Sequence, residues 1–305
     1  MFGFITKTLV LLGMLNLKPV KTYPFPIFER ITMLEQEPTT TPTTTRTNTP
    51  LPIVVLHGLE SSSEQLETFS QWLENTFETS VYNMEIGNGE KTSLYSPLNQ
   101  QLNELCISIY DTPELSKGFD FIGISQGGLL ARGYVERCNS YPVRNLITLV
   151  APHGGIFLPN TPNSGLMYND FFQNHLSIAS YWRNPMMLDT YLTCSYLALL
   201  NNEVWCNNES PIHRQNIRNL SNFVMVWSPE DKVLDPPESA KFSFFDADFN
   251  VIPLEDTELY QTDALGLKHL NYINRLHMYE TNCSHVDHRN PYCFKQLYVI
   301  LRKFL

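Results

Sequence analysis

Short segments rich in apolar residues alternate along the chain with segments whose apolar residues recur at helical spacing. The first pattern predicts a strand over residues 53–56, a continuous apolar run, and further strands over residues 80–86, 119–124, 145–151, 222–227 and 275–281, which also contain polar residues. The second predicts helices over residues 66–77, 97–112, about 126–137 and 292–305. Strands that alternate with helices are joined by right-handed crossovers within a mostly parallel sheet. The sequence therefore predicts an α/β fold, with a mostly parallel central sheet flanked by helices.

The alternation predicts one large domain over residues 51–305, and the chain length of 305 residues is sufficient for it. Between about residues 151 and 222 the alternation stops. Asn, Pro and aromatic residues become frequent there, and the helical patterns are short. We interpret this segment as an insertion over the top of the sheet.

The first 50 residues differ in composition from the rest of the chain. Lys7 precedes an apolar run, Thr8 to Leu17, that is too short to span a bilayer and is typical of a signal-peptide core. We expect residues 1–20 to be a signal peptide; the alternative is a buried first helix. Residues 21–50 are expected to be a spacer, because the Thr/Pro-rich stretch from Glu37 to Pro50 cannot bury apolar surface.

Charge and cysteine content limit the kinds of partner the protein can bind and the cellular compartment in which it is expected. The net charge of −10 argues against a nucleic-acid partner, which requires clustered Lys and Arg. No stretch after residue 50 has the apolar length of a membrane span. Six cysteines, and glycosylation sequons at Asn208, Asn219 and Asn282, fit a secreted protein. The sequence thus predicts the secretory pathway, ending in the lysosome or outside the cell.

The stretch "FDFIGISQGGLLARGYVERC" places Ser125 between a predicted strand and a predicted helix. Gly123 and Gly127 flank this serine at positions where a sharp turn leaves no room for side chains. This Gly-x-Ser-x-Gly context is typical of a nucleophile elbow, which lifts a serine above the carboxyl end of a strand. We therefore expect Ser125 to be a catalytic nucleophile.

A serine hydroxyl needs a base that accepts its proton, and in this fold an acid and then a histidine follow the serine along the chain. The turn after the strand at residues 222–227 offers Asp231 and Asp235, and we favour Asp231 because it comes just past the strand. The loop after the last strand carries His285, with His288 as the alternative base. A Ser-Asp-His triad is the predicted result.

Acyl transfer also needs backbone N–H groups that point at the developing oxyanion. One donor is expected from Gln126, directly after the nucleophile, and the other from Leu59 in the loop after the first strand. Gly58 lets the backbone approach closely. His57 precedes it, and we interpret this histidine as a support for the loop rather than as a base.

With these residues assembled, the chain resembles the palmitoyl-protein thioesterases, a lysosomal branch of the α/β-hydrolases. The resemblance runs from about residue 52 to the C-terminus. Its specific stretches are "VVLHGLESS", "FIGISQGGLLARGYVERC", "SYWRNP", "SYLALLNNE", "FVMVW", "FSFFDADFNVIPLEDTELYQTDALGLK" and "CSHVDH". The run ending in "LGLK" lies far from the predicted chemistry in sequence, and a generic serine hydrolase has no reason to carry it.

The resemblance implies an α/β-hydrolase fold with the triad Ser125, Asp231 and His285 and the oxyanion donors Leu59 and Gln126. It implies hydrolysis of long-chain fatty acyl thioesters through an acyl-serine, without a metal or an organic cofactor. The insertion would then shape an apolar groove for the acyl chain. The groove candidates, each of which ordinary packing would also explain, are Ile156, Phe157, Leu158, Phe171, Phe172, Met186, Met187 and Leu188. We expect a monomer.

The cysteines and several motifs refine the resemblance. Cys106 and Cys138 match a disulfide of the family, and Cys194–Cys206 and Cys283–Cys293 are the expected pairs among the other four, although six cysteines allow 15 pairings. The stretches "HGLESS" and "APHGGIF" lack cysteines that the main protein-deacylating branch carries near these positions. "CSHVDHRNPYC" resembles the second branch, which the family links to acyl-CoA or less bulky thioesters, whereas "NMEIGN" resembles the first.

Both S-acylated proteins or peptides and acyl-CoA therefore remain candidate substrates. Two other functions are compatible with the same residues. The first is a lipase or oxygen esterase, because one triad serves both kinds of ester. The second is a catalytically silent hydrolase fold that binds lipid. A silent fold would usually have lost a member of the triad, and all three are present in this chain.

Overall fold

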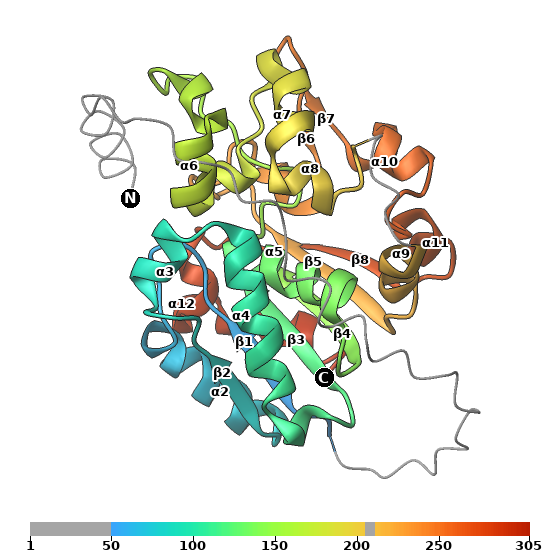
Figure 1. Cartoon of the computed structure of the whole chain (residues 1–305). Coiled ribbons are helices and arrows are strands. Elements are labelled where there is room, and N and C mark those ends of the chain that lie inside the picture. The colour runs from blue at the N-terminus through green and yellow to red at the C-terminus, as the bar shows by residue number, and fades with distance from the viewer. Residues whose placement is uncertain (1–49, 205–210) are drawn as a thin grey trace. The chain divides into compact units, whose positions relative to one another are not determined.

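Six parallel strands form the central sheet, in the order β2-β1-β3-β4-β5-β8 (Figure 1). The structure is a computed structural model that describes residues 50–204 and 211–305. The strands are β1 (Ile53–Leu56), β2 (Val81–Met84), β3 (Phe119–Ile124), β4 (Val143–Leu149), β5 (Asn222–Trp227) and β8 (Leu276–Glu280). They match the six strands expected from the sequence, so the α/β prediction is confirmed. The expected signal peptide, and the spacer apart from Pro50, lie outside the described residues.

Burial explains why the central strands are rich in apolar residues. All four residues of β1 and all six of β3 are buried, because helices cover both faces of the sheet. The edge strands β2 and β8 are only half-buried for most of their length, and they contain the polar residues Asn83 and His277. The apolar runs therefore mark the middle of the sheet and weaken toward its edges.

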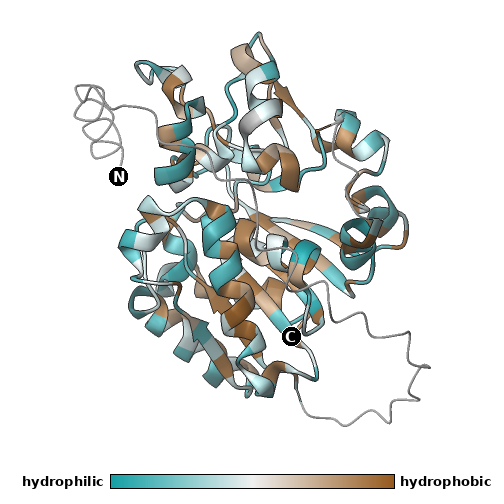
Figure 2. Cartoon of the chain, viewed as in Figure 1, coloured by the Kyte–Doolittle hydropathy of each residue, from teal (hydrophilic) through white to brown (hydrophobic). Residues whose placement is uncertain are grey.

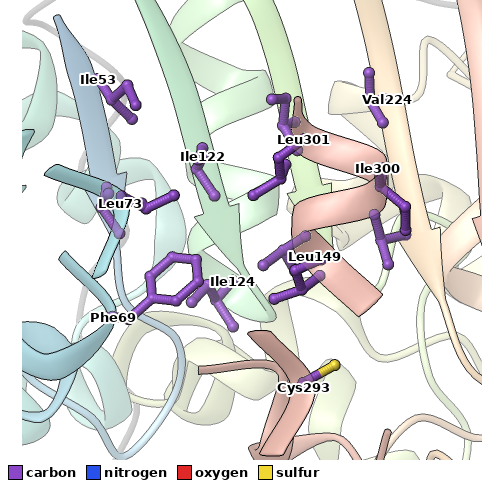
Figure 3. Packing of buried hydrophobic residues seen from close by; sticks show 14 of the residues in the cluster. Ile53, Phe69, Leu73, Ile122, Ile124, Leu149, Val224, Cys293, Ile300 and Leu301 are labelled. Carbon is purple, nitrogen blue, oxygen red and sulfur yellow. The ribbon is translucent and has the colours of Figure 1, made fainter. Parts of the chain in front are cut away.

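Helices α2 (Glu67–Phe77) and α12 (Pro291–Leu301) cover one face of the sheet. Figure 3 shows Phe69 of α2 and Ile300 of α12 among the side chains of the strands. The rings of Trp72 and Phe294 stack with centroids 4.3 Å apart and join the two helices. This face is a continuous apolar core between the first and last helices of the domain.

The opposite face is covered by α4 (Leu98–Tyr110) and α5 (Gln126–Gly133), and α5 continues as a π-helical turn over Tyr134–Cys138. Phe119, Phe121 and Tyr134 pack together there, with ring centroids 5.6–6.0 Å apart. A disulfide bond between Cys106 and Cys138 ties α4 to the π-helical turn, in the pairing that the resemblance implied. Hydrophobic colour in Figure 2 accordingly gathers on the strands, and the outer surfaces of the helices are largely hydrophilic.

The segment between β4 and β5 consists mainly of short helices. They are the 3-10 turns Ser164–Tyr168, Ser177–Tyr181 and Pro185–Met187 and the helices α6 (Asp170–His175), α7 (Leu188–Cys194), α8 (Tyr196–Leu200) and α9 (Pro211–Arg218). Figure 1 shows α6, α7 and α8 together beyond one end of the sheet, where the helix α3 (Glu90–Tyr95) also lies. We refer to residues 151–222 as the insertion.

A second segment, between β5 and β8, packs against the insertion, and the sequence analysis did not predict its elements. It contains the hairpin β6 (Phe244–Phe245) and β7 (Val251–Ile252), the 3-10 turns Pro237–Lys241 and Leu254–Asp256, and the helices α10 (Glu258–Gln261) and α11 (Leu267–Tyr272). The guanidinium of Arg183, in the insertion, lies 3.6 Å from the centroid of the Phe244 ring. Strands of two residues and helices of four to six are too short to give a periodic pattern.

His153, just after β4, leads to a prediction about stability. The side chain is fully buried and its ring stacks on Phe242 at 4.7 Å, while Nε2 lies 3.0 Å from the hydroxyl oxygen of Thr148. Burial, assisted by the charge of Arg132, lowers the pKa of His153 well below its ordinary 6.5. His153 therefore stays neutral in the folded chain at pH values where it binds a proton in the unfolded chain. The free energy of unfolding consequently falls as the pH drops below about 6.5.

We expect the free energy of unfolding to fall less steeply between pH 7 and pH 5 in His153→Gln than in the natural chain. The difference in slope should approach about 1.4 kcal/mol per pH unit, the value for one titrating group. Denaturant unfolding at four or five pH values measures it. Parallel slopes in the two chains would contradict a neutral buried His153.

Candidate active site

The predicted chemical residues meet at the carboxyl ends of four parallel strands. The strand order reverses between β1 and β3, because β2 lies on one side of β1 and all later strands lie on the other. Loops that diverge at such a point leave room for a ligand at the end of the sheet. Ser125 directly follows β3, and Leu59 lies in the loop after β1.

Ser125 occupies a strained turn between β3 and α5. Its φ of 55° and ψ of −126° lie in a region that residues with side chains rarely adopt. A Cβ on Gly123 would lie 2.5 Å from the carbonyl oxygen of Gly127, and one on Gly127 would lie 2.4 Å from that of His57. Both contacts are with backbone atoms. The serine can therefore stand on this turn only because both glycines lack side chains.

Gly127→Ala is expected to destabilise the chain by about 3 kcal/mol or more, because the new methyl group would overlap the carbonyl oxygens of Leu56, at the end of β1, and of His57. Gly165→Ala is the matched control. A Cβ at Gly165 approaches only the flexible side chain of Met187, at 3.2 Å. Thermal and denaturant unfolding compare the two variants, and equal stabilities would contradict the crowding at Gly127.

Hydrogen bonds join Ser125, His285 and Asp231 in one line. Nε2 of His285 lies 2.9 Å from Oγ of Ser125, and Nδ1 lies 2.7 Å from Oδ2 of Asp231. Asp231 follows β5 and is 2% exposed, and His285 follows β8 and is 7% exposed. The other carboxylate oxygen of Asp231, Oδ1, accepts hydrogen bonds from the N–H groups of Val233 and Leu234 at 2.8 and 3.0 Å. The carboxylate and the imidazole are thus held in fixed orientations.

The two alternative residues lie elsewhere. His288 is fully buried, with Nδ1 2.9 Å from the carbonyl oxygen of Ser284 and Nε2 2.8 Å from the hydroxyl of Thr281. Burial lowers the pKa of His288. Its two contacts indicate that it supports the loop that carries His285. Asp235 is half-buried; burial, together with Glu238, raises its pKa. The hydrogen bond of His285 goes to Asp231 rather than to Asp235.

The loop after β1 lies directly against the serine. A Cβ on Gly58 would meet Cβ of Ser125 at 2.8 Å, so the glycine permits a very close approach. Leu59 follows Gly58 and is half-buried. Gln126 is the first residue of α5, so its N–H has no acceptor within the helix. Both predicted oxyanion donors are therefore on segments that border the serine.

His57 holds this loop through the acid Glu85, which the sequence analysis missed. Nε2 of His57 lies 2.6 Å from Oε1 of Glu85, whose Oε2 accepts hydrogen bonds from the N–H and hydroxyl of Ser63. Burial acts to raise the pKa of Glu85, but the Ser63 N–H and His57 outweigh it and leave the pKa below its ordinary value. The signal that could have revealed Glu85 is its position just after β2, at the same end of the sheet.

The groove candidates differ in exposure. Ile156, Phe157 and Phe172 are buried, whereas the side chain of Met186 is 65% exposed. The others are half-buried: Leu158, Phe171, Met187 and Leu188. Ring contacts connect Phe157 with Trp182 and with Phe249 of the second segment. The acyl groove remains a prediction.

A disulfide bond between Cys283 and Cys293 clamps the loop that carries His285 to α12. Cys206 and the glycosylation candidate Asn208 lie outside the described residues, as does the side chain of Cys194, so the expected Cys194–Cys206 pair does too. Asn219 is exposed at the end of α9. Within residues 50–204 and 211–305, no group of three or more His, Cys, Asp or Glu side chains has the arrangement of a metal site. No helix of that part of the chain has the length and apolar character to cross a membrane.

Comparison with known proteins identifies the family. The sequence model of the family described as palmitoyl protein thioesterase matches residues 52–285. The chain belongs to this family. Palmitoyl-protein thioesterase 3 of Dictyostelium discoideum is 36% identical over 255 residues, which cover 79% of this chain and 88% of that protein. Lysosomal thioesterase PPT2-B of Xenopus laevis is 31% identical, over 72% of this chain and 81% of that protein.

The fold is the α/β-hydrolase fold. The solved structure of a monoacylglycerol lipase from Paleococcus ferrophilus matches with a TM-score of 0.51 and 14% identity, over 84% of this chain and 95% of that one. At this identity the likeness shows a common fold and no common substrate. Relatives with both kinds of name, palmitoyl-protein thioesterase and lysosomal thioesterase, match this member of the family.

Proposed function

We propose that this member of the palmitoyl protein thioesterase family hydrolyses long-chain fatty acyl thioesters through an acyl-serine intermediate. The observation that carries the proposal is the line of hydrogen bonds from Asp231 through His285 to Ser125, on a strained turn at the end of β3. Family membership supplies the substrate class, because curated relatives are named palmitoyl-protein thioesterases.

The geometry determines how the proton moves. A carboxylate only accepts hydrogen bonds, so Nδ1 of His285 carries the hydrogen toward Asp231 and Nε2 is free to accept the proton of Ser125. Oγ of Ser125 then attacks the thioester carbonyl carbon. The tetrahedral intermediate collapses, the thiol leaves with the proton from Nε2, and the acyl group stays on the serine. Water, deprotonated by the same nitrogen, releases the fatty acid.

Charge that develops on the carbonyl oxygen during both steps is stabilised by backbone N–H groups. We assign this role to Leu59 and Gln126. The assignment of Leu59 is supported by the close approach of its neighbour Gly58 to Ser125. The assignment of Gln126 is supported by its place at the start of α5, where the N–H has no acceptor within the helix.

The insertion is proposed to bind the acyl chain, through the groove candidates named above. Each methylene group removed from water contributes about 0.8 kcal/mol. A groove that covers most of a palmitoyl chain would therefore favour long chains over short ones. S-acylated proteins or peptides and acyl-CoA are both proposed as acyl donors.

The compartment is proposed to be the lysosome or the extracellular space, reached through the secretory pathway. Two disulfide bonds within the described residues and relatives named lysosomal thioesterases support this assignment. We propose a monomer as the working form.

Hydrolysis of palmitoyl-CoA, an S-palmitoylated peptide and a simple oxygen ester tests the function, with Ser125→Ala measured beside the natural chain. Cleavage of either thioester by the natural chain, but not by Ser125→Ala, supports a thioesterase. The ratio of the rates on the two thioesters ranks the acyl acceptors. Cleavage of the oxygen ester alone would favour a lipase or esterase. If the natural chain and Ser125→Ala behave alike on all three, the catalytic proposal fails and a silent lipid-binding fold replaces it.

A further inference from the structure

The side chain of Gln126 lies in a buried polar network that the proposed chemistry does not use. Gln126 is 1% exposed. Its Nε2 lies 2.8 Å from the carbonyl oxygen of Ser93 in α3 and 3.3 Å from Oε1 of Gln101 in α4. The hydroxyl of Tyr181, in the insertion, lies 3.1 Å from Oε1 of Gln126. Three separate segments therefore hold the residue that follows the nucleophile.

The chemistry of the partners determines which end of the amide faces which neighbour. The carbonyl oxygen of Ser93 can only accept, so the NH₂ group of Gln126 faces it. The amide oxygen must then face Tyr181, whose hydroxyl donates to it. Burial raises the pKa of Tyr181 far above its ordinary value, so this hydroxyl stays protonated and remains a donor. The network has one consistent arrangement of hydrogens.

Tyr181 connects this network to the segment that carries the groove candidates. Its own carbonyl oxygen accepts a hydrogen bond from the N–H of Ile156 at 3.1 Å. The N–H of Arg183 donates to the carbonyl oxygen of Ile156 at 2.8 Å, so residues 156 and 181–183 are joined like a short pair of strands. A displacement of this part of the insertion would therefore move the Tyr181 hydroxyl relative to Gln126.

We propose that Tyr181 is a positioning residue for the oxyanion hole, because its hydroxyl fixes the side chain of Gln126 and so the direction of that residue's backbone N–H. The inference rests on the proposed hydrolysis through Ser125. It adds that the insertion, besides binding the acyl chain, sets the rate of the chemical step. Without the Tyr181 hydroxyl, Oε1 of Gln126 loses a buried donor, and the amide is held only through the hydrogen bonds of its Nε2.

Tyr181→Phe tests the proposal, with Tyr168→Phe as the matched control. Tyr168 is also a buried tyrosine of the insertion, but its hydroxyl bonds to the carbonyl oxygen of Trp182 and the N–H of Asn184. We expect Tyr181→Phe to lower kcat about 10-fold, less than the 10²–10³-fold loss typical of deleting an oxyanion donor, with KM unchanged within about 2-fold. Tyr168→Phe should keep the kcat of the natural chain, although its melting temperature falls.

A second comparison tests whether Tyr181 acts through Gln126. Gln126→Met keeps the backbone N–H and removes the amide of the side chain. If Tyr181 acts through that amide, the double variant Tyr181→Phe with Gln126→Met should have the same kcat as Gln126→Met alone. Losses that multiply in the double variant would overturn the proposal, because Tyr181 would then act on the rate by another route.

Failure of this inference is separable from failure of the proposed function. Turnover by the natural chain over Ser125→Ala tests the hydrolysis, whereas the ratio between the natural chain and Tyr181→Phe tests the positioning. An active natural chain whose kcat survives Tyr181→Phe would overturn the positioning role alone. A change in KM at constant kcat would also overturn it, since it would indicate a role in acyl binding rather than in oxyanion stabilisation.

Discussion

Ser125→Ala is expected to lower kcat for thioester hydrolysis by about 10⁴-fold to 10⁶-fold, the range found when a serine hydrolase loses its nucleophile. The substitution removes only the hydroxyl group of Ser125, and without this group the acyl-serine cannot form. The turn keeps its strained φ of 55°, so the variant should remain folded. Steady-state rates, together with mass spectrometry for a trapped acyl-enzyme, measure the effect.

Ser70→Ala is the control for the loss of a serine hydroxyl. Ser70 is buried on α2, and its hydroxyl has no hydrogen-bond partner in the part of the chain that the structure describes. Its replacement should leave kcat unchanged and cost little stability. If Ser125→Ala retained more than about a hundredth of the natural kcat, the nucleophile would have to be another residue.

Asp231→Asn is expected to lower kcat by about 10⁴-fold, the loss measured for the equivalent change in another serine hydrolase. Oδ1 accepts from the N–H groups of Val233 and Leu234, so the amide oxygen of the asparagine will keep that position. Its NH₂ group must then face Nδ1 of His285. That contact forces the imidazole into the tautomer with a hydrogen on Nε2, which cannot accept the proton of Ser125.

Asp235→Asn is the matched control, because it makes the same chemical change four residues later. The triad hydrogen bond does not involve Asp235, so kcat should change less than about 3-fold. The kcat of both variants on one thioester substrate decides between the two acids. A larger loss in Asp235→Asn than in Asp231→Asn would reverse the assignment.

The strands and the large helices were predictable from the sequence because each has its own periodic signal. β1 is a continuous apolar run, β3 is interrupted by only one charged residue, Asp120, and α2 and α12 carry apolar residues at helical spacing. The hairpin β6–β7 was not predictable, because two residues per strand give no alternation. The helix predicted through about residue 137 was correct in extent, because α5 ends at Gly133 and continues as a π-helical turn to Cys138; the change from α- to π-helical geometry was not predicted.

The residues of the site also differ in how far the sequence predicted them. The Gly-x-Ser-x-Gly turn identified Ser125 because the two glycines are required locally, by contacts with nearby backbone. The preference for Asp231 over Asp235, and for His285 over His288, came from their positions after strands and from the family resemblance, not from a local backbone requirement. The hydrogen bond itself joins two loops whose residues, Asp231 and His285, are 54 positions apart. Only the register of β5 against β8 brings them together.

The sequence by itself determined the order of strands and helices, the position of the serine turn and the family resemblance, since each depends on residues close together in the chain. Only the tertiary structure showed that Asp231 and His285, the residues that the sequence favoured, form one line of hydrogen bonds to Ser125. It also revealed the links from His57 to Glu85 and from Gln126 to Tyr181. The physical reason is that hydrogen bonds between distant segments depend on how the packed sheet positions its loops, and no periodicity along the chain records that arrangement.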